Sequence, residues 1–157
     1  MTEHTFLLQR VQPAMVGLID GSLSTLAPIF GIAFYTHKPH AAFVAGLATS
    51  IGAGISMAYS EGLSDTGEFT GRGSPFVRGS ITGVGTFIGG ILHTLPFLIS
   101  NYHTAVVTAG IIVAFELVGL AAIRWRFFGT SFIKSLGYVT LGGAVIAVVG
   151  ATIGSTA

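Results

Sequence analysis

The sequence contains no cysteine and very little charge. Without cysteine, disulfide frameworks, thiolate metal sites and cysteine nucleophiles are all excluded. Only 8% of the 157 residues are charged, whereas soluble domains carry roughly 25%. Seven Lys and Arg against six Asp and Glu leave no basic patch for nucleic acid, and a hydrophobic content of 51% excludes intrinsic disorder. We therefore expect an integral membrane protein formed by a single domain, 1–157.

Long apolar runs take the place of the missing charge. A helix needs about 20 apolar residues to cross a bilayer, and the runs that reach this length cover about 13–35, 41–62, 79–102, 103–123 and 135–157. They are too long and too uniform for the alternating strands of a membrane barrel. The first run is also too long for a signal peptide. We expect an all-α polytopic fold with five transmembrane helices after a cytoplasmic segment, 1–12.

Lysine and arginine are distributed unevenly between the two sides of this topology. Cytoplasmic loops of membrane proteins carry an excess of these residues. With the N-terminus in the cytoplasm, the outer side holds only Lys38, so the pattern predicts an N-in, C-out orientation. The basic residues of the inner side are Arg10, Arg72, Arg78, Arg124, Arg126 and Lys134.

Small residues recur at helical spacing in three of the runs. Such stripes let helix backbones approach closely in a membrane. General packing within one chain and a specific dimer seam both explain them, and a bundle of five helices is thin enough to need a second copy. The stripes are Gly46, Ser50, Gly54, Ala58 and Gly62, then Gly85 and Gly89, then Gly143, Ala147, Ala151, Gly150 and Gly154.

Two acidic residues and one methionine lie inside the expected spans. With a rise of about 1.5 Å per residue, Asp20, Met57 and Glu116 all lie roughly 8–10 Å from the cytoplasmic side. Intramembrane ionisable groups are costly and indicate function. Two carboxylates with a thioether favour a divalent transition metal ion, and carboxylates left by the ion tend to take up protons. Packing for Met57, pairing with Arg124 for Glu116 and helix capping for Asp20 are the structural alternatives.

Further polar residues extend this hypothesis toward both membrane faces. Glu61 lies one turn from Met57 and is a fourth candidate metal ligand, and Ser24 is an accessory oxygen donor. Glu61, Asp65 and Glu68 follow an i, i+4, i+7 pattern that predicts one acidic helix face, either a cytoplasmic funnel for cations or a solvated helix end. His93 is a candidate proton relay or metal exit residue, with a structural histidine bonded to a carbonyl as the alternative.

Two short motifs resemble the vacuolar iron transporter family. They are Asp-Gly-Ser-Leu-Ser-Thr-Leu-Ala at 20–27 and Ile-Ser-Met-Ala-Tyr-Ser-Glu at 55–61. The similarity is greatest to the membrane domain of bacterial membrane-bound ferritins, which the segments 71–75 and 123–126 also resemble. The resemblance implies a homodimer that exports cytosolic Fe²⁺, sometimes Mn²⁺, in exchange for protons. It carries Asp20, Met57 and Glu61 over as transport residues, and it implies a bacterial inner membrane.

The sequence also departs from this family in several ways. The connection 62–78 is too short for the Glu-rich metal-binding domain of plant and fungal members, Ile19 replaces a frequent Asn, and there is no ferritin-like module. The chain is either a stand-alone transporter or a domain of a longer protein. No permanently bound cofactor is expected, and no nucleophile–base pair indicates an enzyme. A non-transporting dimeric anchor or metal-binding subunit and a passive cation channel remain as alternative functions.

Overall fold

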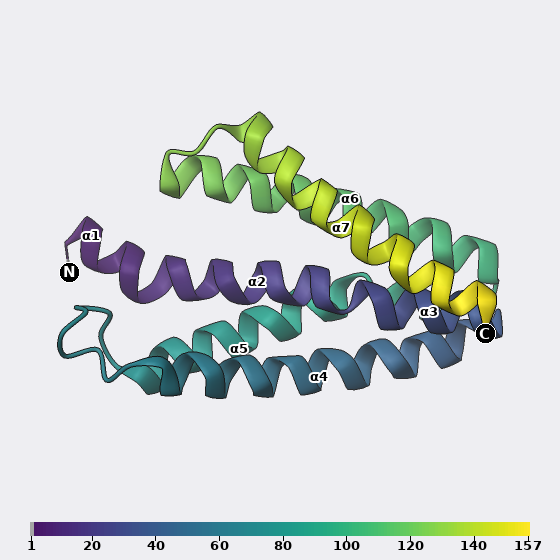
Figure 1. Ribbon diagram of the computed structural model, residues 1–157, viewed down its shortest axis with the longest axis horizontal. Coiled ribbons are helices and arrows are strands. Elements are labelled where there is room, and N and C mark those ends of the chain that lie inside the picture. The colour runs from purple at the N-terminus through teal and green to yellow at the C-terminus, as the bar shows by residue number, and fades with distance from the viewer. Residues whose placement is uncertain (1) are drawn as a thin grey trace.

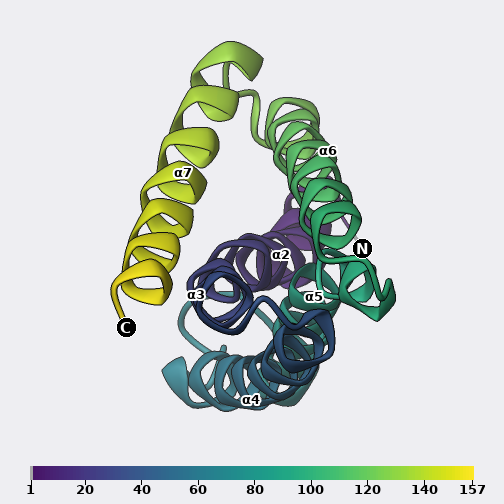
Figure 2. The ribbon, with the colours of Figure 1, turned by 90° about the vertical axis from the view of Figure 1, so that its right-hand side faces the viewer.

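The computed structural model describes residues 2–157 and is helical throughout, with no strand in that range. A central layer lies between two outer pairs of antiparallel helices (Figures 1 and 2). The all-α expectation is therefore confirmed. The central layer is α2 (Gln12–Ser24) with α3 (Leu26–Thr36), one outer pair is α4 (Pro39–Ser64) with α5 (Pro75–Leu92), and the other is α6 (Tyr102–Phe128) with α7 (Phe132–Thr156).

The first helical rod begins earlier than the sequence analysis expects. The short helix α1 (Glu3–Phe6) and the π-turn η1 (Leu7–Val11) lead directly into α2. The Thr2 hydroxyl caps this rod by accepting a hydrogen bond from the Thr5 N–H at 3.3 Å. The segment 1–12 is therefore largely helical over its described residues and extends the first apolar run, rather than forming a separate element. Thr25 lies between α2 and α3 and separates the two helices.

Among residues 2–157, four helical rods are long and apolar enough to span a membrane, and α5 is not one of them. The four are Glu3–Thr36, Pro39–Ser64, Tyr102–Phe128 and Phe132–Thr156. The third expected span, 79–102, is instead divided: α5 ends at Leu92, and the 3-10 turn η2 (Leu95–Leu98) follows. Pro96 explains the division, because proline has no N–H for the helix ladder and disfavours helical geometry in the residue before it.

The long helices, α5 included, lie roughly along the long axis of the molecule (Figure 1). The N-terminus, the loop 65–74 and the α6–α7 turn lie toward one end of the molecule in Figure 1. The α3–α4 turn, the start of α6 and the C-terminus lie at the other. We call these the N-terminal end and the C-terminal end.

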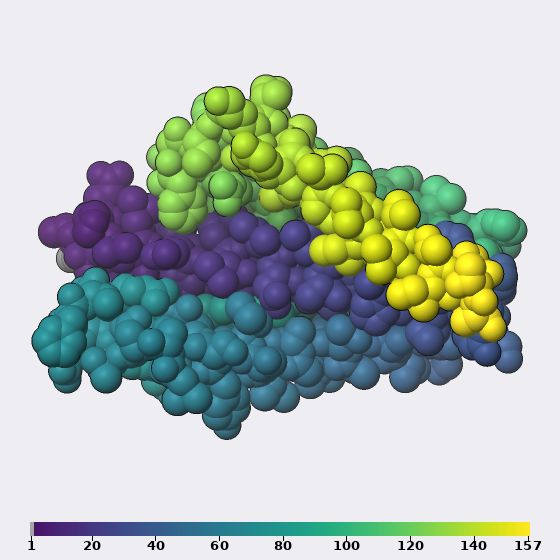
Figure 3. Space-filling model, viewed as in Figure 1, coloured from purple at the N-terminus to yellow at the C-terminus, as the bar shows by residue number. Residues whose placement is uncertain are grey.

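Glycines let the central rod touch its neighbours backbone to backbone. A Cβ on Gly17 or Gly21 would overlap the carbonyl oxygens of Thr82 or Thr86 of α5. Gly150 and Gly154 of α7 approach α3 in the same way. Packing within one chain, one of the two explanations of the small-residue stripes, is thus confirmed for Gly150 and Gly154, whereas Gly17 and Gly21 lie outside the predicted stripes. Between the two outer layers, atoms of the central rod remain visible on the face shown in Figure 3.

Candidate functional site

Four charged side chains form a compact ion-pair cluster at the N-terminal end. Glu61 and Asp65 come from the end of α4, Arg72 from the following loop, and Arg78 from the first turn of α5. The Glu61 carboxylate accepts from Arg72 Nη2 at 2.6 Å and from Arg78 Nε at 2.9 Å. Asp65 Oδ2 lies 3.0 Å from Arg72 Nη1 and 3.3 Å from Arg78 Nη2. The Arg78 side chain is 1% exposed, whereas those of Arg72 and Asp65 are 21% and 23% exposed, so the cluster runs from the interior to the surface.

The backbone around the cluster fixes the arginines. Arg78 also donates to the carbonyl oxygens of Gly73 at 2.9 Å and Asp65 at 3.3 Å. Gly67 and Gly73 have positive φ values of 82° and 73°, which allow the loop to fold back over the guanidinium. Gln9 donates to the carbonyl of Gly71 at 3.0 Å and so ties the N-terminal helix to the same loop.

The same contacts set the protonation of Asp65. Desolvation acts to raise the pKa of its carboxyl. The Thr70 hydroxyl, the Arg72 guanidinium and the charge of Arg78 outweigh this effect, so the pKa lies below its usual value. Asp65 is therefore held as a carboxylate by its neighbours.

The predicted acidic helix face does not form. The helix α4 ends at Ser64, and Asp65 is extended with φ −163° and ψ 162°. Glu61 and Asp65 instead face the two arginines, and Glu68 lies exposed in the loop. The prediction of one acidic helix face was wrong because α4 ends before Asp65. The glycines of the following loop allow this end, and Asp65 forms ion pairs with Arg72 and Arg78 instead. In this arrangement the carboxylate of Glu61 is already neutralised from two sides.

A second cluster of polar side chains is buried halfway along the bundle and connects the central rod, the end of α5 and α6. His93 Nδ1 lies 2.8 Å from Glu116 Oε2, and His93 Nε2 lies 2.7 Å from Thr25 Oγ1. His93 and Thr25 are fully buried, and the Glu116 side chain is 7% exposed. We call these three residues the polar triad. The alternative in which Glu116 pairs with Arg124 is wrong, because Arg124 Nε points to Ser135 Oγ at 3.4 Å.

The polar triad lies where two helices are interrupted. Thr25 is the junction of α2 and α3, and His93 is the first residue after α5. Interrupted helices at membrane depth are tolerated where the freed backbone groups are buried in protein, and transporters place ion sites there. The alternative in which His93 bonds only a backbone carbonyl is also wrong, because both ring nitrogens face side-chain oxygens.

The hydrogen bonds of the polar triad limit how its protons can be arranged. The Thr25 hydroxyl donates to the Gly21 carbonyl at 2.8 Å, so its oxygen accepts from His93 Nε2–H. One further proton is shared between His93 Nδ1 and Glu116, on either the ring or the carboxyl group. Glu116 Oε1 is buried and has no hydrogen-bond partner among the described residues. The triad can therefore hold and transfer one proton, and it presents one unused acceptor atom.

Asp20 and Met57 lie beside different positions along α5. The residue after Asp20 packs on the backbone of Thr86, whereas the residue after Met57 packs on Gly79 and Gly83. Thr86 lies three to seven residues further along α5, which is about 5–10 Å. Both side chains are half-buried. Asp20 lies inside α2 rather than at a helix end, so the capping alternative is wrong.

Glu116 lies deeper still, beside His93, seven residues beyond Thr86 and about 10 Å further along α5. The prediction that Asp20, Met57 and Glu116 lie at one depth was therefore wrong, because they lie beside different parts of α5. The estimate failed for a physical reason: α6 continues to Phe128, twelve residues after Glu116, which puts Glu116 about 18 Å from the helix end. The accessory residue Ser24 is exposed, one turn after Asp20.

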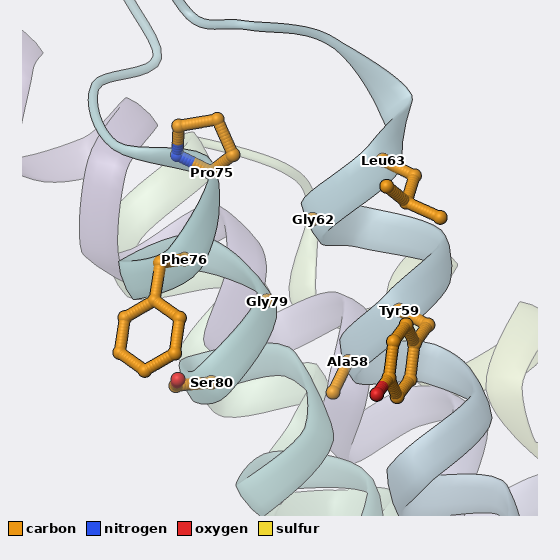
Figure 4. Close-up of a pocket in the computed structure, with 8 residues that line it drawn as sticks. All are labelled: Ala58, Tyr59, Gly62, Leu63, Pro75, Phe76, Gly79 and Ser80. Atoms are coloured by element: carbon orange, nitrogen blue, oxygen red, sulfur yellow. The ribbon is translucent and has the colours of Figure 1, made fainter.

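The predicted metal ligands do not close around an ion within one chain. Among residues 2–157, no three His, Asp or Glu side chains converge into a set that would hold a metal ion. An open groove of about 400 Å³ between α4 and α5 is lined by Ala58, Tyr59, Gly62 and Leu63 and by the first turns of α5 (Figure 4). It contains no charged side chain, so it suits lipid rather than an ion.

Two of the residues that organise these groups had no predicted role. Thr25 belongs to the quoted motif at 20–27 but carried no assigned role. Arg78 was counted only for topology, although an arginine four residues into an otherwise apolar helix is a signal of a buried partner. Comparison of the chain with protein-family models, with curated proteins and with solved structures finds no match.

Proposed function

We propose that this protein exports a divalent transition metal ion, Fe²⁺ or Mn²⁺, from the cytoplasm in exchange for protons. The observation that carries the proposal is the polar triad, a buried chain of hydrogen bonds where two helices are interrupted. Asp20 on α2 supplies a second intramembrane carboxylate, five residues before Thr25. The resemblance of the motifs at 20–27 and 55–61 to vacuolar iron transporters supports the choice of metal.

In the proposed exchange, the intramembrane carboxylate of Asp20 binds a metal ion and a proton in turn. Asp20 and Met57 bind the metal ion, and the ion neutralises the carboxylate in the low dielectric of the membrane. When the ion leaves, a bare carboxylate is costly there, and protonation removes the charge. Glu116 and His93 relay the proton, because their atoms are close enough for a proton to transfer between the carboxylate and the imidazole ring.

The proposed orientation places the N-terminal end in the cytoplasm. Six of the seven lysines and arginines belong to segments at that end, and Lys38 belongs to the opposite one. This distribution is the one expected for an N-in protein. The α5–η2 segment then forms a fifth, interrupted crossing. We further propose a homodimer in a bacterial plasma membrane, in which a second copy supplies the ligands that one chain lacks.

A liposome flux assay tests the proposal. Purified protein is reconstituted into vesicles that contain a metal-sensitive dye or a pH dye, and Fe²⁺ or Mn²⁺ is added outside. We expect metal uptake with opposed proton movement. We expect Asp20→Asn to abolish the flux while the oligomeric state in detergent is unchanged, and Glu3→Gln, which removes an exposed carboxylate, to leave the flux intact.

Other results would favour the alternative functions. Metal uptake without proton movement indicates a passive channel. A fully active Asp20→Asn variant removes Asp20 from the pathway. No flux in either direction, with an altered oligomeric state for Asp20→Asn by light scattering, indicates a non-transporting anchor whose buried carboxylates serve assembly.

A further inference from the structure

Two cavities at the N-terminal end of the bundle have one lining residue in common, Arg10. The first is polar, has a volume of about 150 Å³, and lies between the N-terminal helix and the start of α5. The second is apolar, has a volume of about 400 Å³, and lies between α2, α5 and α6. Arg10 lines both. The polar cavity is otherwise lined by Gln9, Arg72, Ser74, Val77 and Arg78.

The polar cavity has an excess of positive charge. Arg72 and Arg78 are balanced by Glu61 and Asp65. No hydrogen bond or ion pair joins the Arg10 guanidinium to another side chain among residues 2–157. The residues that line the polar cavity, taken with the two carboxylates paired to them, therefore carry one net positive charge.

The start of α5 strengthens this preference for an anion. Ser74 and Pro75 begin that helix beside the cavity. The first backbone N–H groups of a helix have no partner within it, and the helix dipole favours negative charge there. A water molecule needs only about 10–15 Å³ of such volume, so a cavity of about 150 Å³ accommodates a phosphodiester group.

The apolar cavity provides a continuous surface for a hydrocarbon chain. It runs from Phe6 past Val11 and Met15 to Leu18 on the central rod, and Ile123 and Phe127 of α6 form the opposite wall. Phe6 and Phe127 are exposed at its mouth. No charged side chain other than Arg10 lines it. Polar and apolar compartments joined at one arginine match the amphipathic shape of a membrane lipid.

We propose that these cavities bind one anionic phospholipid, with its phosphate beside Arg10 and Arg72 and one acyl chain in the apolar cavity. Basic pockets between transmembrane helices bind anionic headgroups in this way. A free phosphate would leave the apolar cavity unused. A zwitterionic lipid would bring its own cation toward Arg10. The proposal is independent of the transported ion, and it assigns the site to the same membrane face as the loop 65–74.

Native mass spectrometry of the purified full-length chain tests this site. Phosphatidylglycerol and phosphatidylcholine with identical acyl chains are titrated separately. We expect phosphatidylglycerol to bind more tightly, and Arg10→Gln to weaken its binding by about fivefold, the effect of one basic residue near an anionic headgroup. Lys134→Gln is the matched control, because it removes one positive charge from the same end of the molecule but lies outside both cavities. It should leave the affinity unchanged.

A second variant tests the apolar compartment. Ala14 lines the apolar cavity and is half-buried, so Ala14→Phe should fill the cavity and weaken phosphatidylglycerol binding. Glycerol phosphate, which has the headgroup alone, should fail to displace the lipid. If Ala14→Phe does not fold, the comparison of Arg10→Gln with Lys134→Gln still tests the proposal.

Four results would overturn the proposal. They are unchanged phosphatidylglycerol binding by Arg10→Gln, equal losses for Arg10→Gln and Lys134→Gln, equally tight phosphatidylcholine binding, and displacement of the lipid by glycerol phosphate. The last result would assign the site to free phosphate compounds.

Discussion

The pair formed by Arg78 and Glu61 gives the sharpest test of how the N-terminal end is stabilised. Arg78 is 1% and Glu61 10% exposed in their side chains, and Nε and Oε1 are 2.9 Å apart. Replacing Arg78 with Gln removes the ion pair, and it also weakens the bonds to two backbone carbonyls. Breaking one side of a buried pair typically costs about 3–5 kcal/mol. We expect the lower end, about 3 kcal/mol, because Arg72 still bonds Glu61.

A double-mutant cycle separates this pair from its surroundings. The free energy of unfolding is measured by SDS titration in mixed micelles, followed by far-UV circular dichroism, for Arg78→Gln, Glu61→Gln and the double variant. The double variant should cost less than the sum of the single ones by about 1–3 kcal/mol. Arg126→Gln serves as the control, because Arg126 is exposed and contacts the Phe127 ring at 5.6 Å. It should change stability by less than about 0.5 kcal/mol.

Two outcomes would refute this reasoning. The first is a cost for Arg78→Gln no larger than that of Arg126→Gln. The second is strict additivity in the cycle, since it would show that Arg78 and Glu61 act separately.

Three further predictions follow from the packing, the loop and the polar triad. Gly21→Ala should destabilise the fold by about 1–3 kcal/mol in the same titration, because a Cβ there overlaps the Thr86 carbonyl, whereas Gly110→Ala, with open space around it, should be neutral or gain up to about 1 kcal/mol. The pKa of Asp65 is lowered in the fold, so its contribution to stability is present above its unfolded pKa of about 3.8 and is lost as the pH falls through the lower, folded value. The stability difference between the native chain and Asp65→Asn should therefore be constant near neutral pH and shrink below about pH 3.8, and a difference that persists in acid would contradict the assignment. Thr25→Val should cost about 1–3 kcal/mol because His93 Nε2–H loses its acceptor, and an unchanged free energy of unfolding would show that the hydrogen bond does not form.

Some features of this protein are determined by its sequence alone. The low charge and the long apolar runs predict a helical membrane protein, because a helix satisfies its own backbone in lipid and the runs are too long for barrel strands. The small residues at helical spacing predict close packing, because a glycine permits approach whatever its partner is. Both predictions depend on local composition, and the structure agrees with both.

Other features were decided only by the tertiary structure. Sequence spacing suggested that Asp20, Met57 and Glu116 share one depth and that Glu61 and Asp65 share one helix face. The first prediction failed because depth depends on where each helix ends, and α6 continues to Phe128. The second failed because the glycine-rich loop begins directly after Ser64, where α4 ends.

The partners of the buried charges also come from remote parts of the chain. Glu61 meets Arg78 across 17 positions, Glu116 meets His93 across 23, and Thr25 meets His93 across 68. The rotation of each helix about its axis selects these partners, and that rotation is set by packing between helices. Composition therefore determines that buried charges must find partners in a membrane, and only the packed structure determines which partners they find.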